Sequence, residues 1–357
     1  MGKAVLAVPL AMIALVTVVD VLAPSDVHLG PFLVAAPAIT ASFAGPWITA
    51  VIGAVAVLAQ AATAMVRGSV TDLNHTFQIS ALVLISVIVT LFAHLREVHE
   101  KEMIQLRSVA ETAQQVVLRP LRERIGSLRI ASMYLSAVAE AQIGGDLYAA
   151  ARTAQGTRLI IGDVRGKGLE AVGEAALVLG AFRAAARLVG ELPALVAYLE
   201  GAVASDLDDA DIPAKEIGDR NERFVTAAVL DIPDHEPELH IISCGHPPPL
   251  MIRGHHVLPL EVELPAPPLG LAELLHPDVA TETFAFSPGD TLLLYTDGVL
   301  EARDESGAFY PLQERIATFP GAGPHDLLRH LHSDLLAHAA GGVLGDDAAM
   351  VAIQRVQ

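Results

Sequence analysis

The stretch Thr157-Arg-Leu-Ile-Ile-Gly-Asp-Val-Arg-Gly-Lys-Gly-Leu-Glu-Ala171 has the pattern that best indicates the fold of the larger part of this chain. Its first half, Thr157–Val164, is aliphatic and predicts a β-strand. Beyond it, Leu169–Val189 is rich in Ala, Leu and Glu and predicts a long helix. A glycine-rich turn lies between them and begins at the carboxylate of Asp163. Functional groups are often displayed on loops that a rigid scaffold holds in place, so Asp163 is a candidate site residue.

Strand and helix patterns alternate on both sides of this stretch. Further strands are predicted at Leu128–Ala137, Phe224–Asp231, Leu239–Ser243, Thr291–Tyr295 and Ala348–Val356, and further helices at Pro193–Ala204, Pro311–Thr318 and His325–His338. Several of these strands are joined by loops of hairpin length, which favours antiparallel pairing. The pattern therefore indicates a layered α+β domain with a largely antiparallel sheet.

Three more aspartate sites are expected where a hydrophobic strand stops at a glycine-rich turn. Asp146 follows a Gly-Gly pair, Asp297 follows an apolar strand, and Asp346-Asp347 immediately precede the final strand. If these carboxylates and Asp163 converge, their repulsion requires a cation, and all-oxygen ligation favours Mg²⁺ or Mn²⁺. Two such ions could activate water and hold a phosphoryl group. Asp is also common in turns and caps, so the residues alone leave both interpretations open.

The charges are distributed very unevenly along the chain. Only five charged side chains lie in residues 1–95, whereas residues 96–357 hold the other 59 and nearly all of the net charge of −18. An acidic balance of this size excludes a basic nucleic-acid-binding protein, because phosphate recognition needs a positive footprint. The single cysteine, Cys244, excludes an intramolecular disulfide framework and a site built from several thiolates.

The first 95 residues are apolar enough to predict a membrane protein. Uncharged runs predict four transmembrane helices near residues 4–23, 29–45, 47–66 and 75–95, since a helix needs about 20 residues to cross the hydrocarbon layer. A cleaved signal peptide is the alternative for residues 4–23. Lys3 precedes the first span and six Lys or Arg side chains follow the last, so the positive-inside rule places both ends in the cytoplasm.

One carboxylate, Asp20, falls inside the first predicted span. It is either a functional intramembrane group or, as its place near the helix end favours, a residue that reaches the membrane interface. The 95 residues show no paired intramembrane charges, which argues against a transporter. The membrane region is therefore expected to anchor the protein in the lipid or to sense a signal.

Residues 96–125 are expected to link the two parts. No Pro or Gly interrupts Arg96–Arg119, and Pro120 is expected to end the helix. A heptad-like seam of apolar side chains predicts a homodimer through residues 96–119; its members are Met103, Leu106, Ala110, Ala113 and Val117. An amphipathic helix that packs on its own domain is the alternative.

Several motifs of the acidic part occur together and in a fixed order. They are Ile143-Gly-Gly-Asp-Leu-Tyr148, Ile161-Gly-Asp-Val-Arg-Gly-Lys-Gly-Leu-Glu-Ala171, Phe224-Val-Thr-Ala227, Cys244-Gly-His-Pro-Pro248, Pro268-Leu-Gly-Leu271, Gly289-Asp-Thr-Leu-Leu-Leu-Tyr-Thr-Asp-Gly-Val-Leu-Glu-Ala302 and Asp346-Asp-Ala-Ala-Met350. In these motifs, residues 125–357 resemble the SpoIIE-like branch of the metal-dependent (PPM) serine/threonine protein phosphatases.

This resemblance implies a β-sandwich flanked by helix pairs in residues 126–357, with a binuclear Mn²⁺ or Mg²⁺ centre at one end. The implied metal ligands are Asp146, Asp163, the backbone carbonyl of Val164, Asp297 and Asp346, with Asp146 shared. The implied activity is hydrolysis of phosphoserine or phosphothreonine by water that the metals at Asp146 and Asp163 activate. The implied substrate is a phosphorylated signalling protein, an anti-anti-sigma factor, in the cytoplasm.

One departure from the family pattern gives an alternative function. The family usually has a Thr where this chain has Ala349, and the missing hydroxyl could loosen the support of Asp346. Departures at Cys244 and at Phe309-Tyr310 remove no implied ligand. The alternative is a catalytically degenerate phosphatase fold that acts as a membrane-tethered binding module.

Three further side chains are weak candidates for binding substrate. Arg165 and Lys167 flank the expected centre and could steer a phosphorylated substrate, or be ordinary solvated residues. His246 could contact phosphate, although a role in structuring its own loop is the favoured interpretation.

Overall fold

The computed structural model describes residues 6–24, 29–67, 73–136, 144–209, 224–254, 256–271, 279–319, 321 and 323–356. Within the helices, the side chains of 73–75, 103–116 and 206–209 lie outside this description. The chain divides into two compact units, Met1–Gln105 and Leu106–Gln357, each of which is considered by itself.

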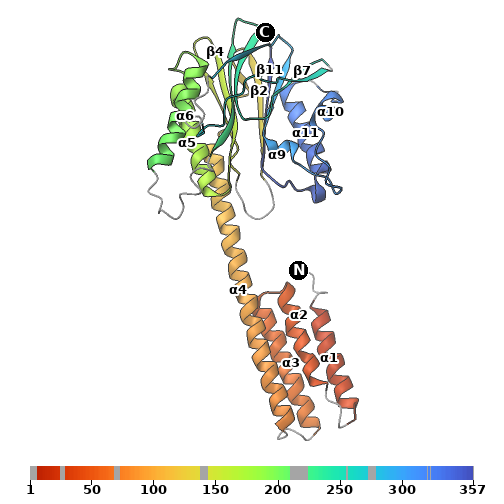
Figure 1. Ribbon diagram of the computed structural model, residues 1–357. Helices are drawn as coiled ribbons and strands as arrows, with labels where there is room; N and C mark the ends of the chain where they lie inside the picture. Colours follow the sequence, from red (N-terminus) through yellow and green to blue (C-terminus); the bar gives the residue numbers. More distant parts are fainter. Residues whose placement is uncertain are drawn as a thin grey trace. The chain divides into compact units, whose positions relative to one another are not determined.

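The first unit is built from apolar helices (Figure 1). They are α1 (Ala7–Leu22), the 3₁₀ helix η1 (Gly30–Val34), α2 (Ala35–Phe43), α3 (Pro46–Val66) and the first part of α4 (Leu73–Val117). Gly45 and Pro46 separate α2 from α3, because Pro favours the first turn of a helix. Helices therefore occupy all four stretches that were predicted to span a membrane.

Two helices in the described part of the chain are long and apolar enough to cross a membrane, by length and composition. They are Pro46–Val66 and the Thr76–Glu102 portion of α4, whereas Ala7–Leu22 and Gly30–Phe43 are shorter apolar helices. The number of spans stays a prediction.

Helix α4 joins the last predicted span to the predicted linker. It continues without a break past residue 95 and ends at Val117, three residues before Pro120. The expected boundary between residues 95 and 96 therefore falls inside one helix. Four members of the predicted dimer seam, from Met103 to Ala113, have side chains outside the described set.

Asp20 has a charged partner, Arg67, which lies just after α3 and beyond the span predicted at residues 47–66. Asp20 is only 3% exposed, and its Oδ1 lies 3.8 Å from Nη2 of Arg67. The same oxygen accepts a hydrogen bond of 2.8 Å from the backbone N–H of Leu29. Asp20 therefore links the end of α1 to Leu29 and to Arg67 at the end of α3 within the unit.

The second unit contains two antiparallel sheets (Figure 1). In spatial order, one sheet consists of β1 (Arg124–Ile125), β2 (Leu128–Leu135), β11 (Ala348–Arg355), β10 (Thr291–Tyr295), β7 (Leu250–Arg253) and β8 (His256–Pro259). The other consists of β3 (Leu147–Arg152), β4 (Gly156–Val164), β5 (Val225–Pro233), β6 (Glu238–Cys244) and β9 (Glu282–Ala285). The antiparallel pairing predicted from the loop lengths is confirmed.

Helices cover the sheets on opposite sides. Helices α5 (Leu169–Ala185) and α6 (Leu192–Asp209) pack on the second sheet, and α11 (Pro324–His338) packs on β2 and β11 of the first. Two shorter helices, α9 (Asp297–Leu300) and α10 (Leu312–Ala317), lie on the side of α11 in Figure 1. This arrangement confirms the predicted α+β sandwich flanked by helix pairs.

Strand β4 shows why the interior of this sandwich is so apolar. Every residue of β4 except Asp163 is buried, as expected for a central strand that is covered on both faces. Cys244, the last residue of β6, is also fully buried. Burial, with a smaller contribution from Glu200, raises the pKa of the Cys244 thiol to about 12.

Arg158 on β4 is a buried cation whose removal is expected to destabilise the sandwich. Its Nε lies 3.1 Å from Oδ2 of Asp231, and its terminal nitrogens donate to backbone carbonyls after α5, those of Ala186, Val189 and Gly190. Arg158→Met leaves these acceptors unpaired, so we expect it to lower the free energy of unfolding by about 3–5 kcal/mol.

The measurement is a urea titration of the purified chain followed by circular dichroism. The matched control is Arg329→Met, because Arg329 is 74% exposed on α11 and should change stability by no more than about 0.5 kcal/mol. Equal midpoints for the two variants would contradict a structural role of Arg158.

Candidate metal centre

A pocket of about 340 Å³ in the second unit is lined by five aspartates. Four of them, Asp146, Asp163, Asp297 and Asp346, are the carboxylates that the sequence singled out, and the fifth is Asp347. The other lining residues are Gly144, Gly145, Val164, Arg165, Gly166, Lys167, Phe224 and Thr226. The structure therefore brings all of the expected ligand residues to one place.

Strand pairing explains why residues far apart in the sequence meet here. Strands β3 and β4 are antiparallel with Leu147 opposite Gly162, so Asp146, just before β3, lies beside Asp163, near the end of β4. Strands β10 and β11 are also antiparallel. Asp297 follows the end of β10, and Asp346 precedes the start of β11, so these two carboxylates share one end of the first sheet.

The expectation that each aspartate sits where a strand stops is correct only in part. Asp163 lies within β4, one residue before its end. Asp146 and Asp346 precede strands, and Asp297 is the first residue of α9. The common feature is the end of the sandwich, because antiparallel strands bring the start of one strand beside the end of the next.

Three glycines allow the backbone to approach closely around the pocket. A Cβ on Gly144 would overlap the side chain of Asp347, and a Cβ on Gly145 would lie 2.6 Å from the carbonyl oxygen of Val164. A Cβ on Gly298 would overlap the carbonyl oxygen of Asp347. The Gly-Gly-Asp and Asp-Gly sequences are thus explained by packing at the site rather than by ordinary turns.

Burial and mutual repulsion dominate the electrostatics of the pocket. Burial, followed by the charge of Asp163, raises the pKa of Asp146 well above its usual value. Burial, followed by the charges of Asp297, Asp346 and Asp347, raises the pKa of Asp163 to about 7. Burial is also the largest cause of the raised pKa of Asp297. These groups can all be ionised together only if a cation lies among them.

Thr296 supports Asp146 from the neighbouring sheet. Its fully buried hydroxyl donates a 2.9 Å hydrogen bond to Oδ2 of Asp146 and accepts a 2.8 Å bond from the backbone N–H of Ala349. A hydroxyl therefore supports the cluster although residue 349 is Ala. The acceptor of that hydroxyl is Asp146 rather than Asp346.

The weak substrate candidates occupy different positions. Nζ of Lys167 lies 3.2 Å from Oδ1 of Asp346, and the guanidinium of Arg165 lies 5.2 Å from the ring centre of Phe224. Both basic residues line the pocket. His246 is buried behind it, with Nδ1 3.5 Å from Oγ1 of Thr226, and burial lowers the pKa of His246 to about 4. A neutral, buried His246 suits the interpretation that it structures its loop.

The sequence pattern did not assign three residues that contribute to the site. Asp347 is 4% exposed and packs against Gly144, Thr296 binds Asp146, and Thr226 donates a 3.3 Å bond to the carbonyl of Asp163. Only Asp347 carried a signal, as the second member of an Asp-Asp pair. The roles of both threonines depend on contacts between distant parts of the chain.

A second group of ligand-type side chains lies elsewhere in the unit. Glu236, Glu238 and His240 bring ligand atoms within 4.8 Å of one another. Nδ1 of His240 lies 2.9 Å from the hydroxyl of Thr283, and its Nε2 lies 3.5 Å from Glu238. Both ring nitrogens thus have protein partners, so this group is explained without a metal.

Similar solved structures define the class to which this fold belongs. The SiaA PP2C domain of Pseudomonas aeruginosa has a TM-score of 0.56 at 18% identity, over 72% of this chain and 98% of that chain. The RsbU and RsbW domains of Rv1364c from Mycobacterium tuberculosis have a TM-score of 0.51 at 23% identity, over 66% of this chain and 63% of that chain. The second unit therefore has the fold of a PP2C phosphatase domain.

A match between sequences identifies the family within this class. The model of the family described as Stage II sporulation protein E (SpoIIE) matches residues 153–356, which is more than half of the chain. The chain belongs to this family, as its motifs predicted. Protein IcfG of Synechocystis sp. is 25% identical over 129 residues, which are 36% of this chain and 20% of IcfG. The chain thus matches about a fifth of the length of that curated relative.

The hydroxyl of Thr296 is expected to matter for metal affinity. Thr296→Val keeps the shape of the side chain but removes the bond to Asp146, so we expect Mn²⁺ to bind about 10–100-fold more weakly. Isothermal titration of the purified chain with Mn²⁺ measures this effect.

Thr296→Ser is the matched control, because it keeps the hydroxyl and should retain most of the affinity. If the Val and Ser variants bind Mn²⁺ equally well, the hydroxyl does not position Asp146 for a metal.

Proposed function

We propose that this chain is a metal-dependent protein phosphatase that hydrolyses phosphoserine or phosphothreonine on a signalling protein. The observation that carries the proposal is the convergence of five aspartates on one pocket, in a chain of the SpoIIE family. A structural turn would explain any single aspartate, but it would not explain why four separate segments place carboxylates together at the cost of raised pKa values.

The donor set fits two Mn²⁺ or Mg²⁺ ions. The oxygens of Asp146, Asp163, Asp297, Asp346 and the Val164 carbonyl would hold them, with Asp146 shared, since hard ions prefer oxygen ligands. When bound, such ions polarise a phosphoryl oxygen and lower the pKa of water. The protein contributes rigidity, because β4 fixes Asp163 and Thr296 orients Asp146.

Arg165 and Lys167 are the residues that we propose for the substrate phosphate. Both lie at the pocket on the turn that follows Asp163. The guanidinium of Arg165 lies over the ring of Phe224, and Nζ of Lys167 lies 3.2 Å from Oδ1 of the partly exposed Asp346. Cationic side chains at the opening of an acidic pocket can attract a phosphorylated protein that the aspartates alone would repel.

A phosphorylated anti-anti-sigma factor is the substrate that we propose. The motifs of the chain resemble those of membrane-anchored family members that act on such factors, which supports this choice of substrate. The match to the SpoIIE family model supports the resemblance in turn. The degenerate binding module remains the alternative. That alternative was suggested by the missing hydroxyl at Ala349. The hydroxyl of Thr296 makes it less favoured, because it donates a hydrogen bond to Asp146 of the same aspartate cluster.

We also propose the arrangement of the whole chain. Residues 1–95 would form a multi-pass region in the cell membrane, the helical part of residues 96–125, which ends at Val117, a linker that pairs two copies, and residues 126–357 the cytoplasmic phosphatase domain. Two helices that are long and apolar enough to cross a membrane support the first part, and the continuous helix α4 supports the second.

Removal of one predicted ligand should abolish phosphatase activity. With Mn²⁺, the purified chain should hydrolyse p-nitrophenyl phosphate and a phosphorylated anti-anti-sigma protein. Asp163→Asn should reduce both rates more than about 100-fold. Replacing a residue that only supports a metal ligand can already reduce activity by up to about 100-fold, and Asp163 is itself a proposed ligand. Asp326→Asn is the matched control, because Asp326 is exposed on α11. A folded native chain that binds Mn²⁺ but hydrolyses neither substrate would favour the binding module.

Membrane association can be tested separately from activity. Membranes from expressing cells should retain the chain after extraction at high pH with carbonate, because apolar spans stay in the bilayer when peripheral proteins are released. Reporter tags at the two ends should both be inaccessible from outside intact cells, as an even number of spans requires. Release by carbonate, or tags on opposite sides, would contradict the proposed arrangement.

A further inference from the structure

A second cavity of the phosphatase-like unit, of about 600 Å³, has six arginines and no acidic residue in its lining among the residues that the structure describes. The arginines are Arg119, Arg122, Arg124, Arg152, Arg183 and Arg187. They come from the segment between α4 and β1, from β1 itself, from β3, and from α5 and the turn after it. Such a concentration of positive charge is notable in a chain with a net charge of −18.

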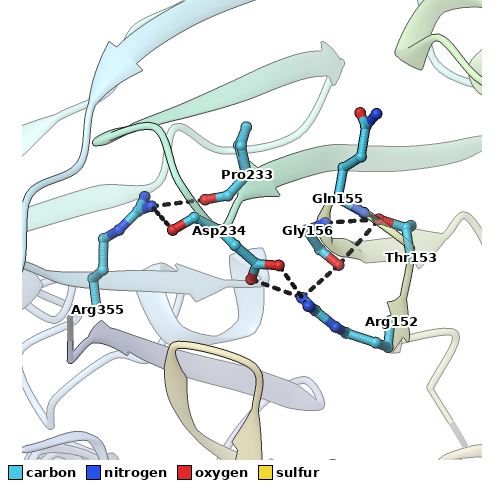
Figure 2. A network of polar contacts seen from close by, with 7 residues as sticks. All are labelled: Arg152, Thr153, Gln155, Gly156, Pro233, Asp234 and Arg355. Atoms are coloured by element: carbon cyan, nitrogen blue, oxygen red, sulfur yellow. Dashed lines mark hydrogen bonds and ion pairs between the residues drawn. The ribbon is translucent and has the colours of Figure 1, made fainter.

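Protein contacts fix one wall of this cavity at Arg152. Figure 2 shows that Arg152 binds both carboxylate oxygens of Asp234, at 2.7 and 2.5 Å, and the carbonyl oxygen of Gly156 at 2.9 Å. Arg355 in turn donates to the carbonyl oxygens of Pro233 and Asp234, at 2.7 and 3.0 Å, and so holds the turn that carries Asp234. Arg152 is thus positioned by the protein and is neutralised by it.

A second part of the lining is fixed at Arg183. Its Nη2 donates a 3.0 Å hydrogen bond to the carbonyl of Val117, the last residue of α4. Burial, and then the positive charge of Arg119, lower the pKa of Arg183. The cavity therefore already contains guanidinium groups that repel each other.

The remaining four arginines have no such neutralising partner. Within the described residues, no carboxylate lies within 4.0 Å of the guanidinium groups of Arg119, Arg122, Arg124 or Arg187, and all four residues are exposed at the cavity. Glu123, which lies between Arg122 and Arg124 in the sequence, instead has its carboxylate 3.9 Å from His325. These four positive charges are available to a ligand.

We infer that this cavity binds an anionic ligand that carries at least one phosphate group. Guanidinium groups match phosphate oxygens in paired hydrogen bonds, and a cavity of this size accommodates a small molecule or a lipid headgroup. The site is separate from the aspartate pocket, with which it shares no lining residue. Arg152 ends β3 and Asp146 immediately precedes it, so the two residues lie roughly 20 Å apart at the usual rise of a strand.

The test uses the full chain in detergent without phospholipid and titrates it with pyrophosphate. A chelator is included so that metal ions cannot recruit pyrophosphate to the aspartates. The double variant Arg122→Gln/Arg187→Gln should weaken binding at least tenfold, and the corresponding double Lys variant should bind with intermediate affinity. Arg329→Gln removes an exposed arginine on α11 and should leave the affinity unchanged.

Two competitors distinguish the source of the phosphate group. If the ligand is a free phosphate compound, glycerol 3-phosphate should displace pyrophosphate with the same affinity as dihexanoyl phosphatidic acid. If the ligand is a lipid headgroup, the phosphatidic acid should bind at least tenfold more tightly than glycerol 3-phosphate, and the double Gln variant should lose that binding. The inference is overturned if the native chain binds none of the three compounds, or if the double Gln variant binds them as the native chain does.

Discussion

The repulsion among buried carboxylates at one end of the sandwich is the constraint on which the second unit depends. Asp146, just before β3, lies beside Asp163 on β4, and burial, followed by the charges of neighbouring aspartates, raises the pKa of each. The backbone must therefore force these groups together against their charges. Central strands buried on both faces supply the rigidity, and the small residues Gly144 and Gly145 supply the close approach. The same geometry makes a pocket whose natural occupant is a cation.

The central part of this fold was predictable from the sequence, and its edges were not. Strands β4, β10 and β11 each contain an apolar stretch with Gly or Asp nearby, so their positions were predicted to within about two residues. Strand β3, with the sequence Leu-Tyr-Ala-Ala-Ala-Arg, has no β-branched residue, and β7, β8 and β9 have four residues each. Such segments become strands because neighbouring strands offer hydrogen bonds, which no local pattern records.

The candidate site shows the same division between local and distant information. Glycines next to aspartates pointed to Asp146, Asp163 and Asp297 before any contact was known. The hydroxyl of Thr296 binds Asp146, which is 150 residues away in the sequence, so no local sequence pattern predicts this hydrogen bond. The arginines after α4 were read as a sign of membrane orientation. Their convergence with Arg183 and Arg187 depends on the packing of α5 beside β3, which joins segments that are distant in the sequence.

The fully buried thiol of Cys244 has a practical consequence. It is the only cysteine of the chain, and its pKa of about 12 keeps it protonated and unreactive at neutral pH. We therefore expect the native protein to resist labelling by maleimide dyes and thiol-specific nitroxides. A single new cysteine on an exposed helix would accept one probe at one defined place. Pairs of such probes would allow spectroscopic distances to be measured between the apolar helices and the sandwich without prior removal of a native thiol.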